Sequence, residues 1–273
     1  PPGGAGLGGR VAGRITRAST FSDLSFTYDD DYLTLGRTPL STRLPIGQGT
    51  FTAKQVVPFL EGLIPENAET RRRWADRLGV ERDDAFSLLA RMGWDCPGAV
   101  QFTHPEDMDE MLARSGVIES ASDADIEERL HTLRDDSASW ALPDEHWSLP
   151  GQQEKFALVR RDDQWFTAKG SAATTHIIKP GIGRLHHQAL VEYATMRAAR
   201  NVGIDVADVS FTHFGTEAAI VIERFDRIRL DDNEVVRVHQ EDFCQAAGVL
   251  PERKYEEHNG PGLALLGDIL GKH

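Results

Sequence analysis

A polar loop and a lysine that follows it at a distance constrain the fold of this chain more than any other feature. The loop runs from Trp147 to Lys155 with Gly151 at its centre, and Lys179 lies 24 residues beyond Lys155. That separation is about the length of a β-hairpin and its return strand. Gly151 lets the backbone approach a ligand closely and the two lysines add positive charge, which predicts a phosphate-binding loop. One glycine between polar residues is often just a turn, so both interpretations remain open.

The elements that follow the loop predict a twisted sheet with one helix. Apolar runs separated by polar residues predict two hairpins, one directly after the loop and one around Gly215. The predicted elements are strands over 156–159 and 165–167, a strand ending at Lys179, a helix over 190–202, and strands over 209–214 and 218–225. Hairpin, lysine strand, helix and second hairpin are the sequence order of a kinase N-lobe.

The first part of the chain alternates short strands with short helices. Alternating apolar residues predict strands over 11–15 and 24–28, and helical spacing predicts helices over 56–65, 71–78 and 84–92. Gly79 and Gly93 follow the last two helices, where we expect each to form a left-handed C-cap. Residues 1–10, rich in glycine and proline, are predicted to be disordered or left over from cloning.

Residues 105–147 are predicted to connect the two parts. Their composition becomes acidic and rich in serine and alanine. Within them, Ser122 can cap a helix whose Ile126, Leu130 and Leu133 form one apolar stripe, so we expect a docked helix in this connector.

Charge and composition limit the classes of partner. The chain has 30 basic and 43 acidic residues, a net charge of −13, which argues against a basic surface that binds nucleic acid directly. Any DNA contact is therefore expected through a partner. No apolar run approaches the length of a membrane helix, and with no signal peptide at the N-terminus the expected location is the cytoplasm. Cys96 and Cys244 match no paired motif and are predicted to be free, buried thiols.

Several motifs occur together, in order and at compatible spacing. In chain order they are V-P-F-L-E-G-L-I-P-E (57–66), Gly93, G-A-V (98–100), S-L-P-G-Q-Q-E-K (148–155), K-G (169–170), T-T-H-I-I-K (174–179), E-Y (192–193), I-E-R-F-D-R (222–227), Q-E-D-F-C-Q (240–245) and G-P-G (260–262). From Val11 onward, the chain resembles the HipA-type toxin serine/threonine kinases of bacterial toxin–antitoxin systems. The resemblance implies ATP as cofactor.

The resemblance also implies roles for particular residues. The nucleotide-phosphate loop would be Pro150, Gly151, Gln152, Gln153, Glu154 and Lys155, with Lys179 on the phosphates and Glu223, Arg224 and Phe225 as the adenine hinge. Glu192 is the candidate that positions Lys179; the alternative is an exposed first-turn glutamate favoured by the helix dipole. Asp226 has the alternative of a plain turn residue. Ser148 matches the family's phosphorylation position, which implies that about two added negative charges eject the loop and silence the kinase.

The sequence departs from the family at its C-terminal end. In the family, a D-x-H-x-x-N catalytic loop and a metal-binding aspartate follow the stretch that matches Gly260–Gly262, and this chain ends at His273. We therefore identify no catalytic residue and no metal ligand here, and expect the Mg²⁺ ligands beyond His273. His258 with Asn259 is interpreted as loop. Adjacent His186 and His187 point apart in regular structure, so they too are expected in a loop.

Together these observations predict an α+β fold: an α/β subdomain (11–104), a connector with a docked helix (105–147), and a kinase-like N-lobe with the start of a mostly helical C-lobe (148–273). The expected function is a toxin kinase that phosphorylates a translation protein, by resemblance glutamyl-tRNA synthetase, and causes growth arrest and persistence. The expected partner is a DNA-binding antitoxin of HipB type, with operator DNA contacted only through it. As given, the chain is predicted to be catalytically incomplete. The alternative is a non-catalytic module that binds an antitoxin or regulates a full-length kinase.

Overall fold

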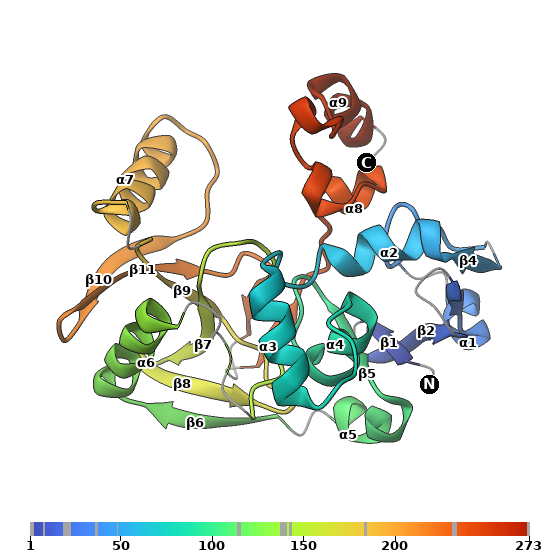
Figure 1. Ribbon diagram of the computed structural model, residues 1–273, viewed down its shortest axis with the longest axis horizontal. Helices are drawn as coiled ribbons and strands as arrows, with labels where there is room; N and C mark the ends of the chain where they lie inside the picture. The colour runs from blue at the N-terminus through green and yellow to red at the C-terminus, as the bar shows by residue number, and fades with distance from the viewer. Residues whose placement is uncertain are drawn as a thin grey trace. The chain divides into compact units, whose positions relative to one another are not determined.

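The chain folds into two compact units. The computed structural model describes residues 3–7, 9–18, 23–35, 38–47, 49–113, 116–136, 141, 144–182, 185–230 and 234–271. The first unit comprises Pro1–Ala113, Ser148–Gly151 and His239–His273, and the second comprises Arg114–Trp147 and Gln152–Val238 (Figure 1). Helices and antiparallel sheets occur in both, so the predicted α+β class is confirmed.

The first unit is built on a five-stranded antiparallel sheet of order β4-β3-β2-β1-β5. Its strands are β1 Gly3–Leu7, β2 Arg10–Arg17, β3 Leu24–Tyr28, β4 Thr50–Thr52 and β5 Val100–Thr103. The strands predicted over 11–15 and 24–28 are confirmed as β2 and β3.

The expected disorder of residues 1–10 is wrong for Gly3–Leu7. This segment pairs with β2 on one side and β5 on the other, so Gly4 is opposite both Arg14 and Thr103. A strand bonded on both sides gains its order from backbone hydrogen bonds, and Ala5 and Leu7 are buried in it. The segment is rich in glycine and shows no alternation of apolar side chains, so the sequence did not predict this strand. Residues 1, 2 and 8 lie outside the described residues.

Short helices complete the first unit. They are α1 Asp30–Thr34, α2 Ala53–Glu61, α3 Ala68–Leu78, α4 Ala85–Met92, α5 Met108–Leu112, α8 Phe243–Ala247 and α9 Leu263–Leu270, with 3₁₀ turns at Pro105–Asp107, Pro251–Arg253 and Glu256–His258. Helices α2 and α4 pack against the sheet and enclose a core that includes Phe26, Phe51, Phe59 and Trp74.

The two predicted glycine caps differ. Gly79 ends α3 with φ of 65°, the expected left-handed C-cap. Gly93 ends α4 with φ of −87°, so the left-handed cap expected there is wrong. A Cβ at Gly93 would lie 2.5 Å from the carbonyl oxygen of Leu89 and 2.7 Å from Cβ of Phe102. Close approach of the backbone, and not its dihedral angle, is the reason for glycine at position 93.

The C-terminal segment docks on the first unit. Glu241 Oε1 accepts a hydrogen bond from the backbone N–H of Thr42 at 3.0 Å. Gln245 Nε2 donates to Phe59 O at 2.8 Å. Lys254 Nζ lies 2.8 Å from a carboxylate oxygen of Glu66. The structure thus groups residues 239–271 with the N-terminal part, whereas the sequence grouped them with the kinase-like lobe.

The second unit contains a six-stranded sheet of order β10-β11-β9-β7-β8-β6 with antiparallel neighbours. Its strands are β6 Val117–Ala121, β7 Phe156–Arg161, β8 Gln164–Lys169, β9 His176–Pro180, β10 Val209–Phe214 and β11 Glu217–Glu223. A separate two-stranded sheet joins β12 Arg227–Arg229 to β13 Val235–Arg237. Both predicted hairpins and the lysine strand are confirmed; β6 was not predicted.

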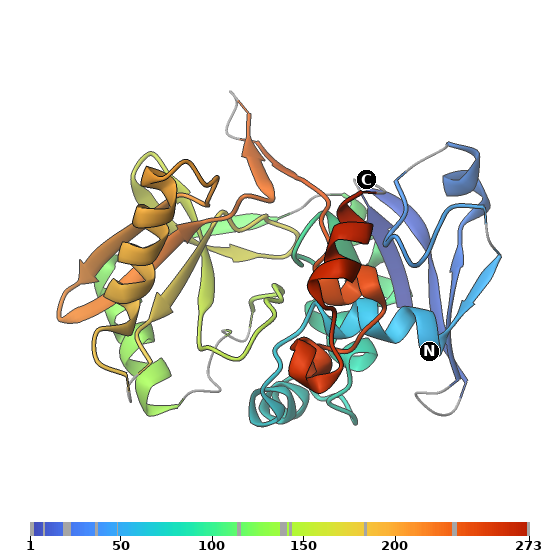
Figure 2. The same cartoon turned by 90° about the horizontal axis from the view of Figure 1, so that it is seen from above.

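Two helices pack on this sheet. Helix α7 (Gln188–Asn201) lies along β10 and β11 (Figure 2). Helix α6 (Asp123–Asp135) contacts β9, β10 and β11 and buries the predicted stripe of Ile126, Leu130 and Leu133. Ser122 caps α6 by accepting from Asp125 N at 3.2 Å, so the docked helix of the connector is confirmed.

Cys96 and Cys244 are free and buried, as predicted. None of the helices in the described part of the chain has the length and apolar character needed to cross a membrane.

Candidate nucleotide site

An ion pair joins the sheet of the second unit to α7. Lys179 lies on β9 opposite Ile220 of β11, and its Nζ is 2.9 Å from Glu192 Oε1. Both side chains are about one-fifth exposed, 19% for the lysine and 21% for the glutamate. Helix α7 begins at Gln188, which places Glu192 beyond the first turn, so the dipole alternative loses its geometric basis. The arrangement is the one expected if Glu192 positions Lys179.

Two glutamines extend this pair into the loop. Gln188 Nε2 donates to Glu192 Oε2 at 3.1 Å, and its Oε1 accepts from Gln153 Nε2 at 3.2 Å. Gln153 Nε2 also donates to the carbonyl of Pro180, next to Lys179, at 3.0 Å. We call Gln153, Gln188 and Glu192 the glutamine relay. Each hydrogen bond along it joins a donor to an acceptor, so the three side chains hold one another and Lys179 in place. Sequence reasoning identified Gln153 but missed Gln188.

The first half of the loop is held by the first unit. Ser148 is fully buried, its Oγ donates to the carbonyl of Leu63, and its N–H donates to Asp95 O at 3.0 Å. Gly151 has φ of 100°, a conformation that favours glycine, and its carbonyl accepts from Glu66 N at 3.1 Å. Residues 148–151 are therefore anchored, and the conformation at Gly151 explains why glycine stands there.

The rest of the predicted loop differs in exposure. Pro150 and Glu154 are half-buried, Gln152 is exposed and Lys155 is buried at 6% exposed. The sequence assigned both lysines to phosphate. The structure leaves Lys179 as the more exposed of the two.

The predicted hinge follows β11. Glu223 ends the strand, Arg224 is buried, and Phe225 is 73% exposed. Asp226 is 4% exposed and pairs with Arg224 at 2.9 Å, so the alternative of a plain turn residue does not describe it. Sequence reasoning missed this pair; the spacing Arg-x-Asp within I-E-R-F-D-R was the available signal.

A buried histidine begins the lysine strand. His176 is 7% exposed, its Nδ1 lies 2.8 Å from Thr175 Oγ1, and its ring packs edge-on against Trp165. Burial, assisted by the charges of Arg160 and Arg229, lowers the pKa of His176 to about 4. The imidazole is therefore neutral at physiological pH and supports the strand as a polar core residue.

Potential metal ligands do not gather in the part of the chain that the structure describes, which has no group of three or more His, Cys, Asp or Glu suited to a metal ion. His186 and His187 lie in the turn before α7, as expected.

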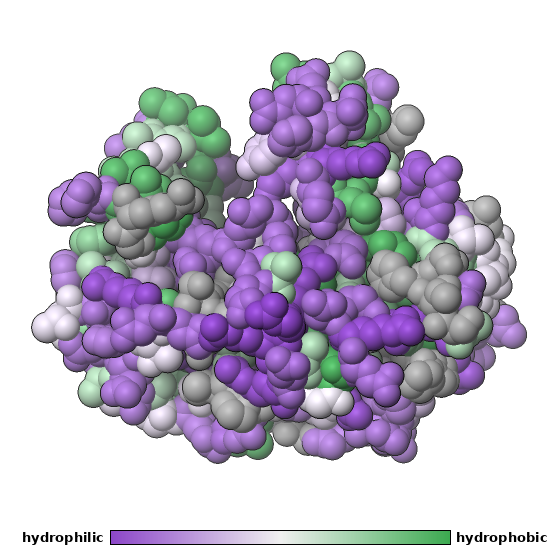
Figure 3. Space-filling model, viewed as in Figure 1, coloured by the Kyte–Doolittle hydropathy of each residue, from purple (hydrophilic) through white to green (hydrophobic). Residues whose placement is uncertain are grey.

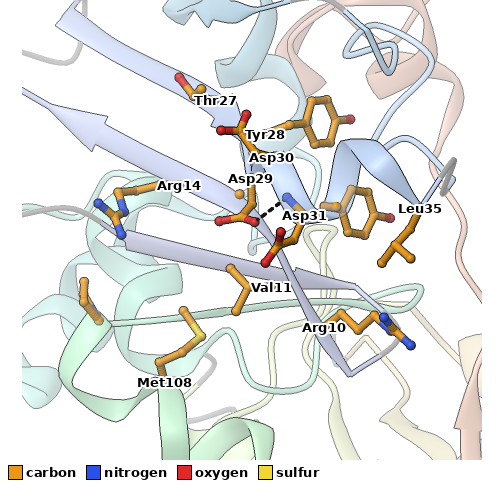
Figure 4. Close-up of a pocket in the computed structure, with 13 residues that line it drawn as sticks. Arg10, Val11, Arg14, Thr27, Tyr28, Asp29, Asp30, Asp31, Leu35 and Met108 are labelled. Atoms are coloured by element: carbon orange, nitrogen blue, oxygen red, sulfur yellow. Dashed lines mark hydrogen bonds between the residues drawn. The ribbon is translucent and has the colours of Figure 1, made fainter.

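A concave region lies on the first unit (Figure 4). It is a groove of about 840 Å³, where Asp29, Asp30 and Asp31 lie between Arg10 and Arg14. Asp31 N donates to Asp29 Oδ1 at 3.0 Å. Its mixture of both charges favours no single ligand class, so the functional assignment rests on the Lys179 site.

Comparison with known proteins shows the family. The profile of the HipA N-terminal domain matches residues 5–103, and that of the HipA-like C-terminal domain matches residues 147–273. The Sinorhizobium fredii protein Y4mE, named as a kinase, is 36% identical over 260 residues, which cover 93% of this chain and 60% of that protein. The serine/threonine-protein kinase toxin HipA of Shewanella oneidensis is 32% identical over 268 residues, covering 94% of this chain and 57% of the toxin.

A solved structure agrees with these relatives. The Shewanella oneidensis HipA structure, in complex with HipB and operator DNA, superposes with a TM-score of 0.74 at 30% identity, covering 96% of this chain and 60% of that one. The chain thus spans 57% to 60% of the length of these relatives. The resemblance seen in the motifs is confirmed, and the chain belongs to the HipA family.

Proposed function

We propose that this chain is the nucleotide-binding part of an ATP-dependent serine/threonine protein kinase toxin. The observation that carries the proposal is the pair of Lys179 on β9 with Glu192 on α7, 2.9 Å apart. A lysine held by a helix carboxylate keeps its ammonium at a fixed point, where it can neutralise phosphate charge. ATP, when bound, supplies the phosphoryl group.

Other groups of the chain fit a nucleotide. Gly151, whose φ of 100° favours glycine, leaves the loop without a side chain at that position. In the described residues, the N–H and C=O of Phe225 have no hydrogen-bond partner, and the residue is 73% exposed, which supports a contact with the edge of a base. Both features support the proposed nucleotide site.

Catalysis requires more than these residues provide. Phosphoryl transfer needs metal ligands and a residue that positions the attacking hydroxyl, and the described residues offer no metal-binding group. Helix α9 exposes Leu263, Leu265 and Leu270, and none of its residues is buried. Hydrophobic surface is visible where this helix lies, beside hydrophilic surface (Figure 3). An exposed apolar helix of this kind favours packing against further protein. We therefore propose that the described residues bind nucleotide but do not by themselves hold the Mg²⁺ that phosphoryl transfer needs.

The burial of Ser148 supports a regulatory role. Its hydroxyl is inaccessible to any kinase while residues 148–151 stay bonded to Leu63, Asp95 and Glu66. Phosphorylation thus requires the loop to leave first, and a phosphoserine could not return, because about two negative charges would be buried without partners. We propose that phosphorylation of Ser148 traps the loop outside and silences the kinase.

The proposed partner is a DNA-binding antitoxin of HipB type. Support comes from the solved relative, a HipA bound to HipB and operator DNA. The net charge of −13 favours contact with the operator through the antitoxin.

The proposed target is a translation protein in the cytoplasm, by family resemblance glutamyl-tRNA synthetase. The proposed outcome is growth arrest. A non-catalytic module that binds the antitoxin is the second candidate, favoured because the described residues include no group of three or more His, Cys, Asp or Glu suited to a metal ion.

Radioactive phosphoryl transfer tests the proposal. The chain and a version extended past His273 are incubated with [γ-³²P]ATP, Mg²⁺ and glutamyl-tRNA synthetase. We expect labelling only with the extended protein, and loss of that labelling in its Lys179→Met variant. Labelling by the short chain would contradict the proposed incompleteness. Absence of labelling by both, with antitoxin binding retained, would favour the second candidate.

A further inference from the structure

We propose that three buried residues of the second unit set the base selectivity of the nucleotide site: Arg224, Asp226 and Thr174, here called the hinge clamp. The inference rests on the proposed ATP binding, because it assigns to these residues the positioning of the backbone that reads the adenine ring. They are positioning residues, since burial keeps them from touching the base.

The hinge clamp is a buried ion pair with a two-point contact. Arg224 Nε and Nη2 donate to the two carboxylate oxygens of Asp226 at 3.0 and 2.9 Å. Arg224 Nη1 donates to Thr174 Oγ1 at 2.8 Å. Arg224, Asp226 and Thr174 are 3%, 4% and 0% exposed. A bidentate guanidinium–carboxylate pair fixes the orientation of both groups, and here the two groups flank a single residue, Phe225.

Backbone bonds fix the same turn at both ends. Arg224 N donates to Thr175 O at 2.9 Å, and Val238 N donates to Asp226 O at 2.9 Å. Phe225, between these anchors, is 73% exposed. Its N–H and C=O have no hydrogen-bond partner among the described residues. Among the described residues, the turn therefore has one unpaired backbone donor and one unpaired acceptor, on a backbone that the clamp fixes.

A fixed donor and acceptor can distinguish two purines. The Watson–Crick edge of adenine has an acceptor at N1 and a donor at N6, whereas guanine has a donor at N1 and an acceptor at O6. A backbone segment held in one conformation matches one of these patterns. Loosening the segment weakens that match but leaves the phosphate contacts of Lys179 unchanged. The clamp therefore affects recognition of the base and not of the triphosphate.

The choice of variant follows from the clamp's geometry. Asp226 also accepts from Arg227 Nη1 at 2.8 Å, so Asp226→Asn would leave two buried guanidinium groups without their shared counter-charge and is expected to unfold the unit. Thr174→Val is the sharper change, because it removes one hydroxyl at nearly constant volume. Thr174→Ser is the matched control, since it keeps the hydroxyl. Arg224→Lys keeps the charge but loses the two-point contact.

Calorimetric titration with ATP, GTP and inorganic tripolyphosphate tests the inference. Thr174→Val and Arg224→Lys are expected to weaken ATP binding by about fivefold to tenfold and to lower the ATP-to-GTP affinity ratio, with tripolyphosphate within about twofold of the unmodified chain. Thr174→Ser should bind ATP like the unmodified chain. Unchanged ATP affinity in both clamp variants, or an equal loss of affinity for ATP and for tripolyphosphate, would overturn the inference.

The unmodified chain separates this inference from the proposed function. If it binds tripolyphosphate but shows no preference for ATP over GTP, the clamp inference fails while the phosphate site stands. If it binds neither ATP nor tripolyphosphate, the proposed function itself fails.

Discussion

Lys179 Nζ lies 2.9 Å from Glu192 Oε1, and this contact joins the strand β9 to the helix α7 across 13 positions of sequence. The pair is partly exposed, so its two charges interact through water as well as protein, and its contribution to folding stability is small. We propose that the pair holds the lysine in position for a ligand.

Glu192→Gln is expected to separate the effect of the ion pair on ligand binding from its effect on folding stability. The change removes the charge that orients Lys179 but keeps the shape of the side chain. We expect ATP affinity to fall about tenfold and the free energy of unfolding to change by about 1 kcal/mol or less. Fluorescence titration with a labelled ATP analogue and urea denaturation measure the two quantities. A large loss of stability with unchanged ATP affinity would mean that the pair is structural only.

The glutamine relay predicts that the loop and the ion pair are coupled through Gln188. In a double-mutant cycle, Gln153→Ala and Glu192→Gln should show non-additive effects on ATP affinity, with a coupling of about 0.5–1 kcal/mol. Repeating the cycle with Gln188→Leu in every variant should reduce the coupling to near zero. Persistence of the coupling without Gln188 would show that the two side chains communicate by another route.

Much of the second unit could be predicted from local sequence patterns, whereas contacts between residues far apart in sequence could not. Lys179 on its strand and the stripe of Ile126 on α6 follow from periodicity and capping, which involve residues close in sequence. The contact of Arg224 with Thr174 joins positions 50 apart, and that of Gln245 with Phe59 joins positions 186 apart. No periodicity encodes such pairs.

Two further features escaped prediction for different physical reasons. Gly3–Leu7 has too few side chains to show the alternation of a strand, although a strand paired on both sides depends mainly on its backbone. Lys155 has the same residue type as Lys179 and was given the same role, but burial depends on the packing around it. Residue type identified both lysines as candidates, and the structure shows that their exposure differs.

The buried His176 predicts a loss of stability in mild acid. Its pKa is about 4 in the folded chain against an ordinary value of 6.5, so the unfolded chain binds the proton more readily below pH 6.5. Above pH 6.5 the histidine is neutral in both states, and it does not lower the free energy of unfolding. As the pH falls below 6.5 the free energy of unfolding decreases, and below pH 4 the loss reaches about 3 kcal/mol. His176→Gln should be less stable at pH 7 but lose less between pH 7 and pH 4.5, measured by urea denaturation. Parallel pH profiles for the two proteins would contradict the assignment.

Ser148→Asp should release the loop that Ser148 anchors. A carboxylate placed at a fully buried position without a counter-charge is unfavourable, so the segment should detach and expose Lys155. Trypsin cleavage after Lys155, followed by mass spectrometry, should then be faster than in the unmodified chain by about tenfold or more. Ser210→Asp, at an exposed position of β10, is the control and should leave the cleavage rate unchanged. Equal rates for Ser148→Asp and the control would show that the loop stays in place.

The central claim, that the Lys179 site holds a nucleotide, is tested most directly by isothermal titration of the chain with ATP. A matched pair of lysine variants isolates the site: Lys179→Met, and Lys254→Met in the first unit, where the lysine pairs with Glu66 at 2.8 Å. We expect one ATP per chain, a loss of affinity of at least about tenfold in Lys179→Met, and no change in Lys254→Met. Equal affinity in Lys179→Met and the unmodified chain would contradict it.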